Sequence, residues 1–600
     1  MRLFSAILLL FSAITLAKTE NTPYKPSQLF LVGGGLKSCS SMSKNQCLTP
    51  EKHQEIEVNN SKTHALFQLN HKTRAQVFAL MDQEYSAEHA KQLKKLLNKA
   101  IKNASKTPVS KGEMVKFLKT FDNNQLINRL SDPEYFLLLD ALEIAQIDKV
   151  TGERLQETVD LDRSKNSFTP QIYRDFVKRA QRLTHQQRPH ILVVTASARD
   201  SFEAVDFYIQ AFVQAGANTQ WLPIDASLQP LISATANDRA NLCDQLPTKR
   251  LAIQKSAYRE AIYPDLVHQQ RLACLEPQRL LEQVKQADGI FINGGDQSLT
   301  KQAFIKANGQ DTEVMALIRE KFDRGNFIIG GTSAGTAVMA GGQFNQHAMV
   351  MITSGQSDRA MFYGAHADVV PTEGCQKSNT CNDAPNDQLT YATSGGLGLF
   401  NLGILDTHFS ERGRQGRLAV LAHTTQHQLA FGVDERTALV VTRLNQDKHE
   451  LSVVGQSGVF IVENPLIANN TNANNTDTNN TPSRLTVKTH YIHQGDSLVV
   501  NDTGTLKFSL SKDKVVTEQT TGLLPEINNI FAGENYLKAA KLLCLSDQTE
   551  LIGNVSYDNQ RGKVIVTKTE HSVSVQGLYQ LAKVEKHDCS YTHYQLTLSH

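Results

Sequence analysis

A serine in a glycine-pinched turn is the strongest chemical signal in this sequence. Residues 328 to 340 read Ile-Ile-Gly-Gly-Thr-Ser-Ala-Gly-Thr-Ala-Val-Met-Ala, which predicts a buried strand, a tight turn carrying Ser333 and a helix of small residues. The pattern from Gly331 to Gly335 is typical of a nucleophile elbow, where glycines let strand and helix approach closely. The helix N-terminus would favour negative charge developing beside the hydroxyl. A tight turn with an incidental serine is the alternative that this motif leaves open.

Acyl transfer by serine requires a base, a group that orients the base, and donors for the oxyanion. His408 follows a predicted strand at 402 to 406 and is the candidate base. Glu435 follows another predicted strand and is the candidate orienter, with the adjacent Asp434 as its competitor. The backbone N–H groups of Ala334 and Gly295 are the candidate oxyanion donors.

Alternating strands and helices are expected to position these side chains. Strands are predicted at 29 to 32, 190 to 195, 219 to 224, 288 to 292 and 326 to 330, and helices at 202 to 215, 276 to 286, 298 to 307 and 312 to 324. This rhythm predicts an α/β fold with a mainly parallel, doubly wound sheet. Ligands bind such sheets beyond the C-terminal strand ends. Ser333 and the segment 294 to 297 both follow strand ends, so we expect them to converge.

The chain is too long for one simple core, and the composition suggests several parts. We expect a catalytic domain of 26 to 36 and 190 to 502, a helical insertion at 37 to 189 and a small α+β addition at 503 to 600. The Asn/Thr-rich segment 466 to 483 is expected to be a disordered loop. Helices are predicted at 73 to 104, with a lysine-rich face, and at 132 to 145, with Asp132 as N-cap. Apolar strands are predicted at 450 to 462 and 485 to 499.

The N-terminus predicts export. Residues 1 to 17 combine one arginine, an apolar run and a small-x-small site ending at Ala17, as in a cleaved signal peptide, and an uncleaved anchor is the alternative. We therefore expect a secreted or periplasmic protein with no membrane attachment after cleavage. The formal net charge of +2 gives no argument for nucleic-acid binding. The sequence leaves the oligomeric state open, a homodimer included.

Eight cysteines agree with an exported chain, because an even number there favours disulfides. Their positions suggest four neighbouring pairs: Cys39 with Cys47, Cys243 with Cys274, Cys375 with Cys381, and Cys544 with Cys589. No metal-ligand spacing is present, so we expect neither a metal nor another cofactor.

Four motifs in order resemble the cyanophycinase family of serine peptidases. They are Gly294-Gly295-Asp296-Gln297, Gly330 to Gly335, Asp406-x-His408-Phe409-x-x-Arg412-x-Arg414-x-x-Arg417-Leu418, and Gly432-Val433-Asp434-Glu435-x-Thr437-Ala438. The resemblance covers the strand at 29 to 35 and about 190 to 500. It implies a class I glutamine-amidotransferase-like fold, related to that of the aspartyl dipeptidases. It does not account for the insertion or for the residues beyond 503.

The resemblance implies Ser333 as nucleophile, His408 as general base and Glu435 as orienter. The substrate would be cyanophycin, a poly-aspartate chain with arginine on each β-carboxyl group, and the product the β-Asp-Arg dipeptide. The implied substrate-binding residues are Gln297, Asp406, Thr407, Arg412, Arg414 and Arg417. At least one of these arginines is open to a structural salt bridge instead.

One departure keeps alternatives open, since the family motif has glutamine where this chain has Thr407. An aspartyl dipeptidase acting on short Asp-x peptides is the second enzyme hypothesis. A non-catalytic periplasmic binding protein on the same fold is the third.

Overall fold

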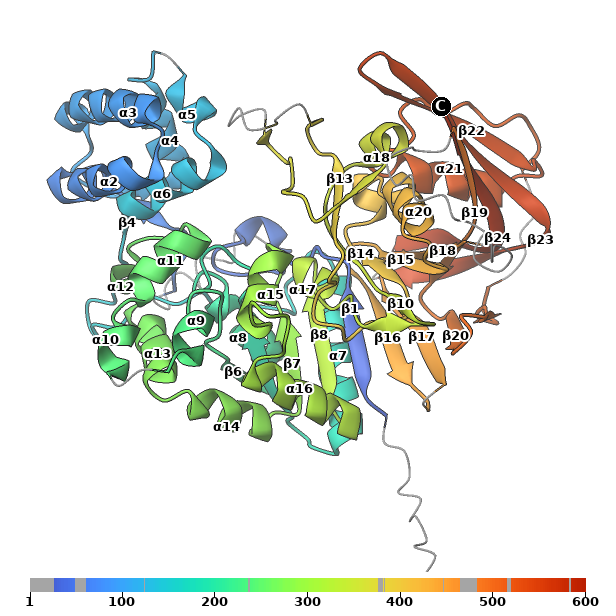
Figure 1. Cartoon of the computed structure of the whole chain (residues 1–600), viewed down its shortest axis with the longest axis horizontal. Coiled ribbons are helices and arrows are strands. Elements are labelled where there is room, and N and C mark those ends of the chain that lie inside the picture. Colours follow the sequence, from blue (N-terminus) through green and yellow to red (C-terminus); the bar gives the residue numbers. More distant parts are fainter. Residues whose placement is uncertain are drawn as a thin grey trace, which may run out of the picture.

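A computed structural model describes residues 26–48, 61–123, 125–235, 238–375, 381, 384–445, 447–464, 483–514, 520–581 and 584–600. The expected signal peptide at 1 to 17 and almost all of the expected loop at 466 to 483 lie outside these residues. The fold is mixed α/β, with two large sheets at the centre and right of Figure 1 and a separate group of helices at upper left.

A nine-stranded sheet forms the centre of the molecule, in the order β21-β20-β17-β16-β1-β8-β7-β5-β6. Its parallel half contains five strands, and the other four strands run antiparallel to their neighbours. The parallel strands are β1 (Gln28–Val32), β8 (Ile328–Thr332), β7 (Gly289–Ile292), β5 (His190–Val194) and β6 (Asn218–Trp221). The antiparallel strands are β16 (Thr437–Arg443), β17 (Lys448–Gly455), β20 (Ser497–Asn501) and β21 (Leu506–Ser509).

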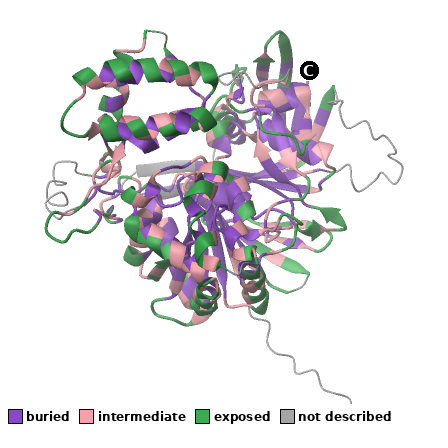
Figure 2. Cartoon of the chain, turned by 60° about the vertical axis from the view of Figure 1, so that its left-hand side comes forward, coloured by how far each residue is buried: buried purple, intermediate pink, exposed green. Residues whose placement is uncertain are grey.

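Helices cover both faces of the parallel half, because each strand alternates its apolar side chains between two cores. Phe30 and Val32 pack with α7 (Phe168–Thr184) and α8 (Val205–Gln214). Leu29 and Leu31 pack in the opposite core, with α14 (Gln278–Gln286), α15 (Gln297–Phe304) and α16 (Glu313–Arg324). The buried sheet lies between exposed helix surfaces in Figure 2. The predicted helices and strands of this half are present, with ends shifted by a few residues.

A second sheet of seven strands has the order β14-β15-β18-β19-β24-β23-β22. Its strands are β14 (Ile404–Asp406), β15 (Leu429–Val433), β18 (Gly458–Glu463), β19 (Arg484–His493), β22 (Glu550–Tyr557), β23 (Gln560–Leu581) and β24 (Val584–Ser599). One face packs in the same core as the first sheet. The other packs against α18 (Ser357–Tyr363), α20 (Gln415–Thr424) and α21 (Asn535–Cys544).

Two long strand predictions were wrong, because the chain crosses between the sheets. The segment predicted as one strand at 450 to 462 divides after Gly455, where φ is 125°, into β17 and β18 of different sheets. The segment 485 to 499 likewise divides into β19 and β20. A continuous apolar pattern does not reveal such a crossing, since both sheets bury these residues.

The residues beyond 503 contribute strands to both sheets. β21 pairs with β20, and β24 pairs with β19 from Arg484 to Tyr491. Likewise α7, which falls in the expected insertion, packs on the central sheet through Ile172 and Phe176. The parts therefore share cores that local composition could not reveal.

The helices at upper left in Figure 1 have their own apolar core. They are α2 (His71–Glu84), α3 (Ala87–Ala100), α4 (Lys111–Lys119), α5 (Leu126–Arg129) and α6 (Asp132–Leu142). The helix predicted at 73 to 104 is thus two helices, broken between Glu84 and Ala87. The N-cap of α6 is Ser131 and not Asp132, because the Ser131 side chain accepts the Glu134 N–H in a capping box.

Smaller strands and helices connect these parts. The short strands are β2 (Leu66–Phe67), β3 (Val109–Ser110), β4 (Glu143–Ile144), β9 (Gln343–Phe344), β10 (His347–Ala348), β11 (Met351–Ser354), β12 (Ala365–Ala367) and β13 (Leu389–Ala392). The remaining α-helices are α9 (Gln229–Ser233), α10 (Arg239–Cys243), α11 (Leu246–Gln254), α12 (Arg259–Ile262) and α13 (Pro264–Leu275). Among the residues with described positions, no helix is long and apolar enough to cross a bilayer.

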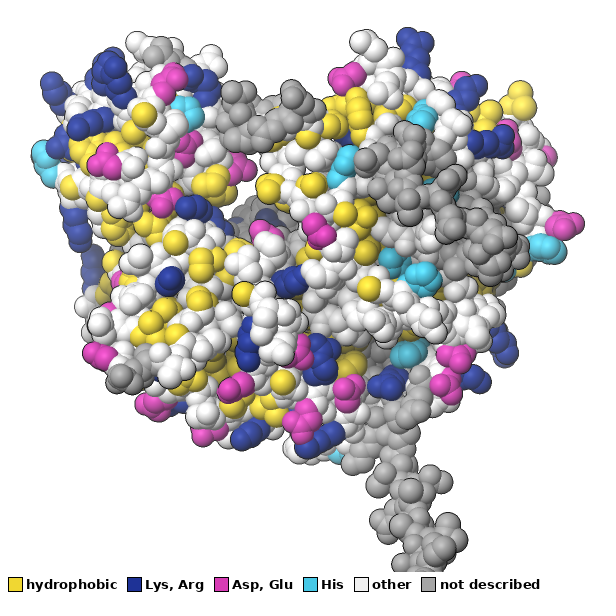
Figure 3. Space-filling model, in the orientation of Figure 1, with side chains coloured by type: hydrophobic (Ala, Val, Ile, Leu, Met, Phe, Trp, Pro, Cys, Tyr) yellow, Lys and Arg dark blue, Asp and Glu magenta, His cyan; other side chains and the backbone are white. Residues whose placement is uncertain are grey.

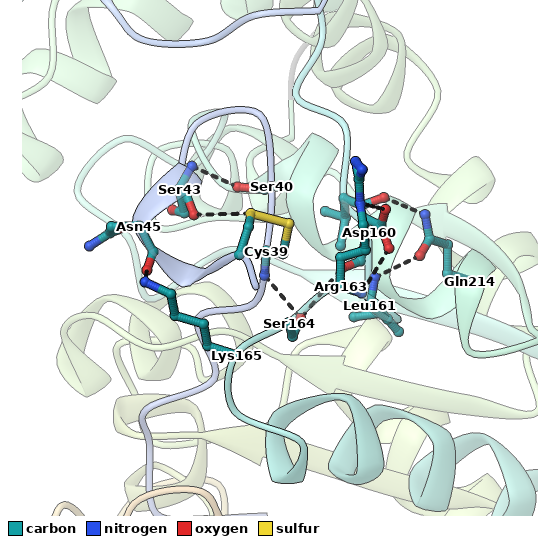
Figure 4. Close-up of a disulfide and its surroundings, with 12 residues drawn as sticks. Cys39, Ser40, Ser43, Asn45, Asp160, Leu161, Arg163, Ser164, Lys165 and Gln214 are labelled. Carbon is teal, nitrogen blue, oxygen red and sulfur yellow. Dashed lines mark hydrogen bonds and ion pairs between the residues drawn. A yellow bond between two sulfur atoms is a disulfide. The ribbon is translucent and has the colours of Figure 1, made fainter. Parts of the chain in front are cut away.

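The four expected cysteine pairs are all joined as disulfides. The Cys39–Cys47 bridge closes the loop that follows β1, shown in Figure 4. The Cys39 N–H donates to Ser164 Oγ at 3.0 Å, and Lys165 Nζ donates to the Asn45 carbonyl at 2.8 Å. The loop is thereby fastened to residues 160–165, just beyond the glycines at the end of β1.

Candidate active site

Ser333 lies between β8 and the one-turn helix α17 (Ala334–Ala337), in a backbone conformation that few side chains adopt. Its φ is 56° and its ψ is −121°. The Ser333 N–H donates to the Val32 carbonyl at 3.0 Å, which joins the turn to β1. A Cβ on Gly335 would lie 2.4 Å from the Asn293 carbonyl oxygen, so glycine is needed where α17 meets β7. The turn therefore holds the hydroxyl at the N-terminus of α17.

His408 follows β14 and meets the serine across the strand ends. Its Nε2 lies 2.7 Å from Ser333 Oγ, and its Nδ1 lies 2.7 Å from Glu435 Oε1. The backbone of His408 is also left-handed, with φ 46°, and its N–H donates to the Gly33 carbonyl at 2.8 Å. A Cβ on Gly34 would lie 2.2 Å from His408 Cε1, so this loop must carry glycine beside the imidazole. The three side chains form one hydrogen-bonded chain.

The electrostatics favour a neutral histidine beside an ionised carboxylate. Burial lowers the pKa of His408; the hydrogen bond to Glu435 opposes this shift, and the charge of Arg412 adds to it. The hydrogen bond to His408 lowers the pKa of Glu435. With Nδ1–H donating to Glu435, Nε2 is free to accept the serine proton.

The structure distinguishes the two neighbouring acids after β15. Asp434 is fully buried and accepts the Tyr491 hydroxyl at 2.5 Å and the Ser410 N–H at 2.9 Å. Glu435 points the other way, toward His408. Its own N–H donates to both carboxylate oxygens of Glu411, each at 3.1 Å. Glu435 is thus the acid in contact with the imidazole, while Asp434 holds the surrounding backbone.

The candidate oxyanion donors lie in two segments that adjoin Ser333. Ala334 is the first residue of α17, whose N–H has no partner within the helix. A Cβ on Gly294 would lie 3.5 Å from Ser333 Oγ, so the turn from Gly294 to Gly295 adjoins the hydroxyl. The Asp296 N–H donates to the Ser197 carbonyl at 2.7 Å and fixes this turn.

The residues expected to bind substrate do not share one environment. Asp406 and Arg417 are each 3 % exposed and bond to each other twice, at 2.8 and 2.6 Å. Arg414 donates to the Thr407 carbonyl and to Asp406, and Thr407 is buried. These contacts support the loop that carries His408. Asp406 and Arg417 thus occupy each other's polar groups, and the Thr407 backbone bonds to Asp406 and Arg414; their roles in substrate binding stay predictions.

Arg412 and Gln297 differ from that buried set. Arg412 is exposed, while Gln297 is half-buried and donates to the Ile352 and Thr353 carbonyls at 2.9 and 3.0 Å. Gln297 therefore joins the start of α15 to β11. Arg412 is the member of the arginine motif whose side chain reaches the surface.

Sequence reasoning missed two contributors to the site. The sequence patterns give Gly34 no role beside the imidazole and do not point to Glu411. The signal for Glu411 was its place three residues after His408 in the arginine-rich motif. Its contact with Glu435 could not be read from that spacing. Across the described parts of the chain, no group of three or more His, Cys, Asp or Glu side chains could hold a metal ion.

Comparison with known proteins points to one group of relatives. Over 319 residues the chain is 27% identical to the cyanophycinases of Trichormus variabilis and Nostoc sp., covering 52% of this chain and 86% of each relative. It is 28% identical over 221 residues to the cyanophycinase of Synechococcus elongatus, covering 37% of this chain and 55% of that one. No family model matches the sequence. The sequence matches relate this chain to the cyanophycinase family.

Proposed function

We propose that this protein is an exported serine-type peptidase that hydrolyses cyanophycin to β-Asp-Arg dipeptides through an acyl-enzyme. The single observation that carries the proposal is the hydrogen-bonded chain from Ser333 through His408 to Glu435, with 2.7 Å at each contact. The relatives named cyanophycinase supply the substrate class. The parallel half of the central sheet supports a class I glutamine-amidotransferase-like fold.

The reaction follows from the roles of the three side chains. Ser333 Oγ attacks the scissile carbonyl carbon as its proton passes to His408 Nε2, and Glu435 stabilises the resulting imidazolium. The N–H groups of Ala334 and Gly295 would donate to the oxyanion. His408 then gives its proton to the leaving amine, which leaves an acyl ester on Ser333. A water molecule deprotonated by His408 hydrolyses this ester and restores the free serine.

Export is proposed from the N-terminal sequence together with the disulfides. Four disulfides in the structure are typical of a protein that folds in an oxidising compartment. Mass spectrometry of the mature N-terminus tests the cleavage site, for which we expect Lys18 as the first residue.

Release of β-Asp-Arg from purified cyanophycin, followed by liquid chromatography and mass spectrometry, tests the activity. We expect release by the wild type and by the control Ser509→Ala, an exposed serine on β21, and none by Ser333→Ala. A serine-directed fluorophosphonate should label Ser333 in the wild type. Equal release by wild type and Ser333→Ala would exclude this nucleophile.

A parallel assay with short Asp-x peptides tests the second enzyme hypothesis. Thr407, where the family motif has glutamine, is the observation that keeps an aspartyl dipeptidase under consideration. Cleavage of α-linked dipeptides without any action on polymer would favour that activity. Polymer binding without turnover or labelling would instead favour a binding protein.

A further inference from the structure

Two adjoining cavities lie where the C-terminal strands meet the helices beside the candidate active site. Their volumes are about 640 and 750 Å³. Both are lined by Asn529, Val555 and Ser556, so they adjoin, and together they are here called the C-terminal groove. Its walls include residues 528–533 and 554–563, which lie beyond the segment that carries the family motifs.

One end of the C-terminal groove includes a residue of the motif that carries His408. Arg412 lines this end, together with Arg359 and Tyr557. Arg412 lies four residues after His408, at the end of a single turn of 3₁₀-helix, and its charge acts on both His408 and Glu435. A chain seated on Arg412 would therefore lie on the segment that carries the candidate base.

The lining of the C-terminal groove is strongly basic. Asp358 is its one acidic residue, and this aspartate pairs with Arg359, which also lies over the Tyr557 ring. At the far end, Arg561 and Lys563 are exposed, two residues apart on β23, and face the same side of the strand. Among the ion pairs of the described residues, none involves these two or Arg412.

Polar groups without charge separate the two basic ends. Asn529 and Ser556 are exposed in the middle of the groove, and the half-buried Asn554 lies opposite Lys563 across the β22–β23 pair. Amide and hydroxyl groups can bond to the peptide groups of an extended chain, while arginine forks match carboxylates. Such spacing suits a chain that carries carboxylates at intervals.

We propose that the C-terminal groove is an exosite for a peptide chain that carries carboxylates at intervals. On cyanophycin it would bind the α-carboxylates of the arginine branches, at a distance from the scissile bond. The proposal rests on the proposed function for the identity of the substrate. It gives the residues beyond 503 a role in holding long substrates. Short substrates that extend no further than Arg412 would not reach Arg561 and Lys563.

Binding of a fluorescent poly-L-aspartate peptide to the Ser333→Ala protein, measured by anisotropy, tests the groove without requiring hydrolysis. We expect Arg561→Ala/Lys563→Ala to raise Kd about three- to tenfold, as removal of two exposed charge contacts should. Ser556→Asp, which places a negative charge in the middle of the groove, should also weaken binding. The matched control is Lys95→Ala/Lys102→Ala, which removes two exposed lysines from the basic face of the helical region. This control should leave Kd within about twofold.

Equal Kd values for Arg561→Ala/Lys563→Ala, here called the groove variant, and for the control would overturn the exosite. A Kd for Ser556→Asp equal to that of the parent protein would overturn it as well. Thermal melts of each variant establish that the fold is intact. In the Ser333-containing enzyme, the groove variant should raise KM for polymer and leave the turnover of a short β-aspartyl substrate unchanged. If the groove variant binds poly-L-aspartate more weakly than the control but the wild type hydrolyses no polymer, the proposed function is refuted and the groove stands. Normal hydrolysis with unaltered KM for polymer would refute only the groove.

Discussion

Two regions of this molecule bury charged side chains, and they do so to different ends. At the base of the helical region, Arg259 is 1 % exposed and bonds to Glu143 at 2.7 Å and Asp200 at 3.1 Å, and its Nη2 donates to the Asp140 carbonyl at 3.2 Å. At the candidate active site, the chain of hydrogen bonds ends on a neutral, half-buried hydroxyl. Buried charge alone therefore does not mark a site.

The two groups of side chains differ in whether a proton can move between them. Around Arg259 the groups are ions that neutralise one another, and Asp140 is also held by Arg199 at 2.8 Å. In the triad, only Glu435 is held as an ion, and the proton between Ser333 and His408 can move. The first arrangement should contribute to stability and the second to reaction rate.

Ser333→Ala gives the largest expected effect, because it removes the proposed nucleophile. We expect kcat on cyanophycin to fall by about 10⁵- to 10⁶-fold. The melting temperature should stay close to that of the wild type, since the hydroxyl is half-buried and carries little of the core. A large fall in melting temperature with little loss of activity would mean that Ser333 stabilises the fold and is not the nucleophile.

Glu435→Gln should lower kcat by about 10⁴-fold, because the amide cannot stabilise an imidazolium and can favour the wrong tautomer. Steady-state kinetics on polymer measure this loss. Asp434→Asn is the informative comparison. It removes a buried carboxylate bonded to Tyr491, so it should lower stability and leave more activity per folded molecule than Glu435→Gln. The reverse ranking would make Asp434 the orienter.

Arg259→Met should lower the free energy of unfolding by about 3–5 kcal/mol, because it leaves buried carboxylates without their partner. Urea denaturation measures the change. Arg279→Met is the control, since Arg279 is 53 % exposed and pairs with Glu276 one turn away. That change should cost less than about 1 kcal/mol. If both variants have the same free energy of unfolding, the buried Arg259 cluster stabilises the fold no more than an exposed ion pair does.

The smallest expected effect is a shift in pH dependence. His408 must be neutral to accept a proton, and burial lowers its pKa below the ordinary value of 6.5. The kcat/KM profile should therefore be flat above this pH and fall only as the pH drops through the lower pKa. Glu435→Gln removes the contact that opposes the shift, so its acidic limb should move to still lower pH. An acidic limb above pH 6.5 would contradict a buried, neutral base.

Much of the parallel half of the fold could be predicted from the sequence. The strands that end at Val32, Ile292 and Thr332 are short apolar runs bounded by glycine, and such runs depend mainly on neighbouring residues. The antiparallel half could not be predicted in the same way. The crossings at Gly455 and between β19 and β20 depend on strands that pair far along the chain.

The candidate site also combines features that local sequence determines with features that depend on distant segments. By itself the sequence determined the glycine-pinched serine turn, the order of serine, histidine and glutamate, and the cysteines available for pairing, because these are local patterns. Only the tertiary structure decided that Glu435 and not Asp434 meets His408, that Asp406 and Arg417 bond to each other, and that the last strands build a groove beside Arg412. Adjacent residues leaving a strand can point in opposite directions, and their partners come from distant segments, so local sequence does not contain that choice.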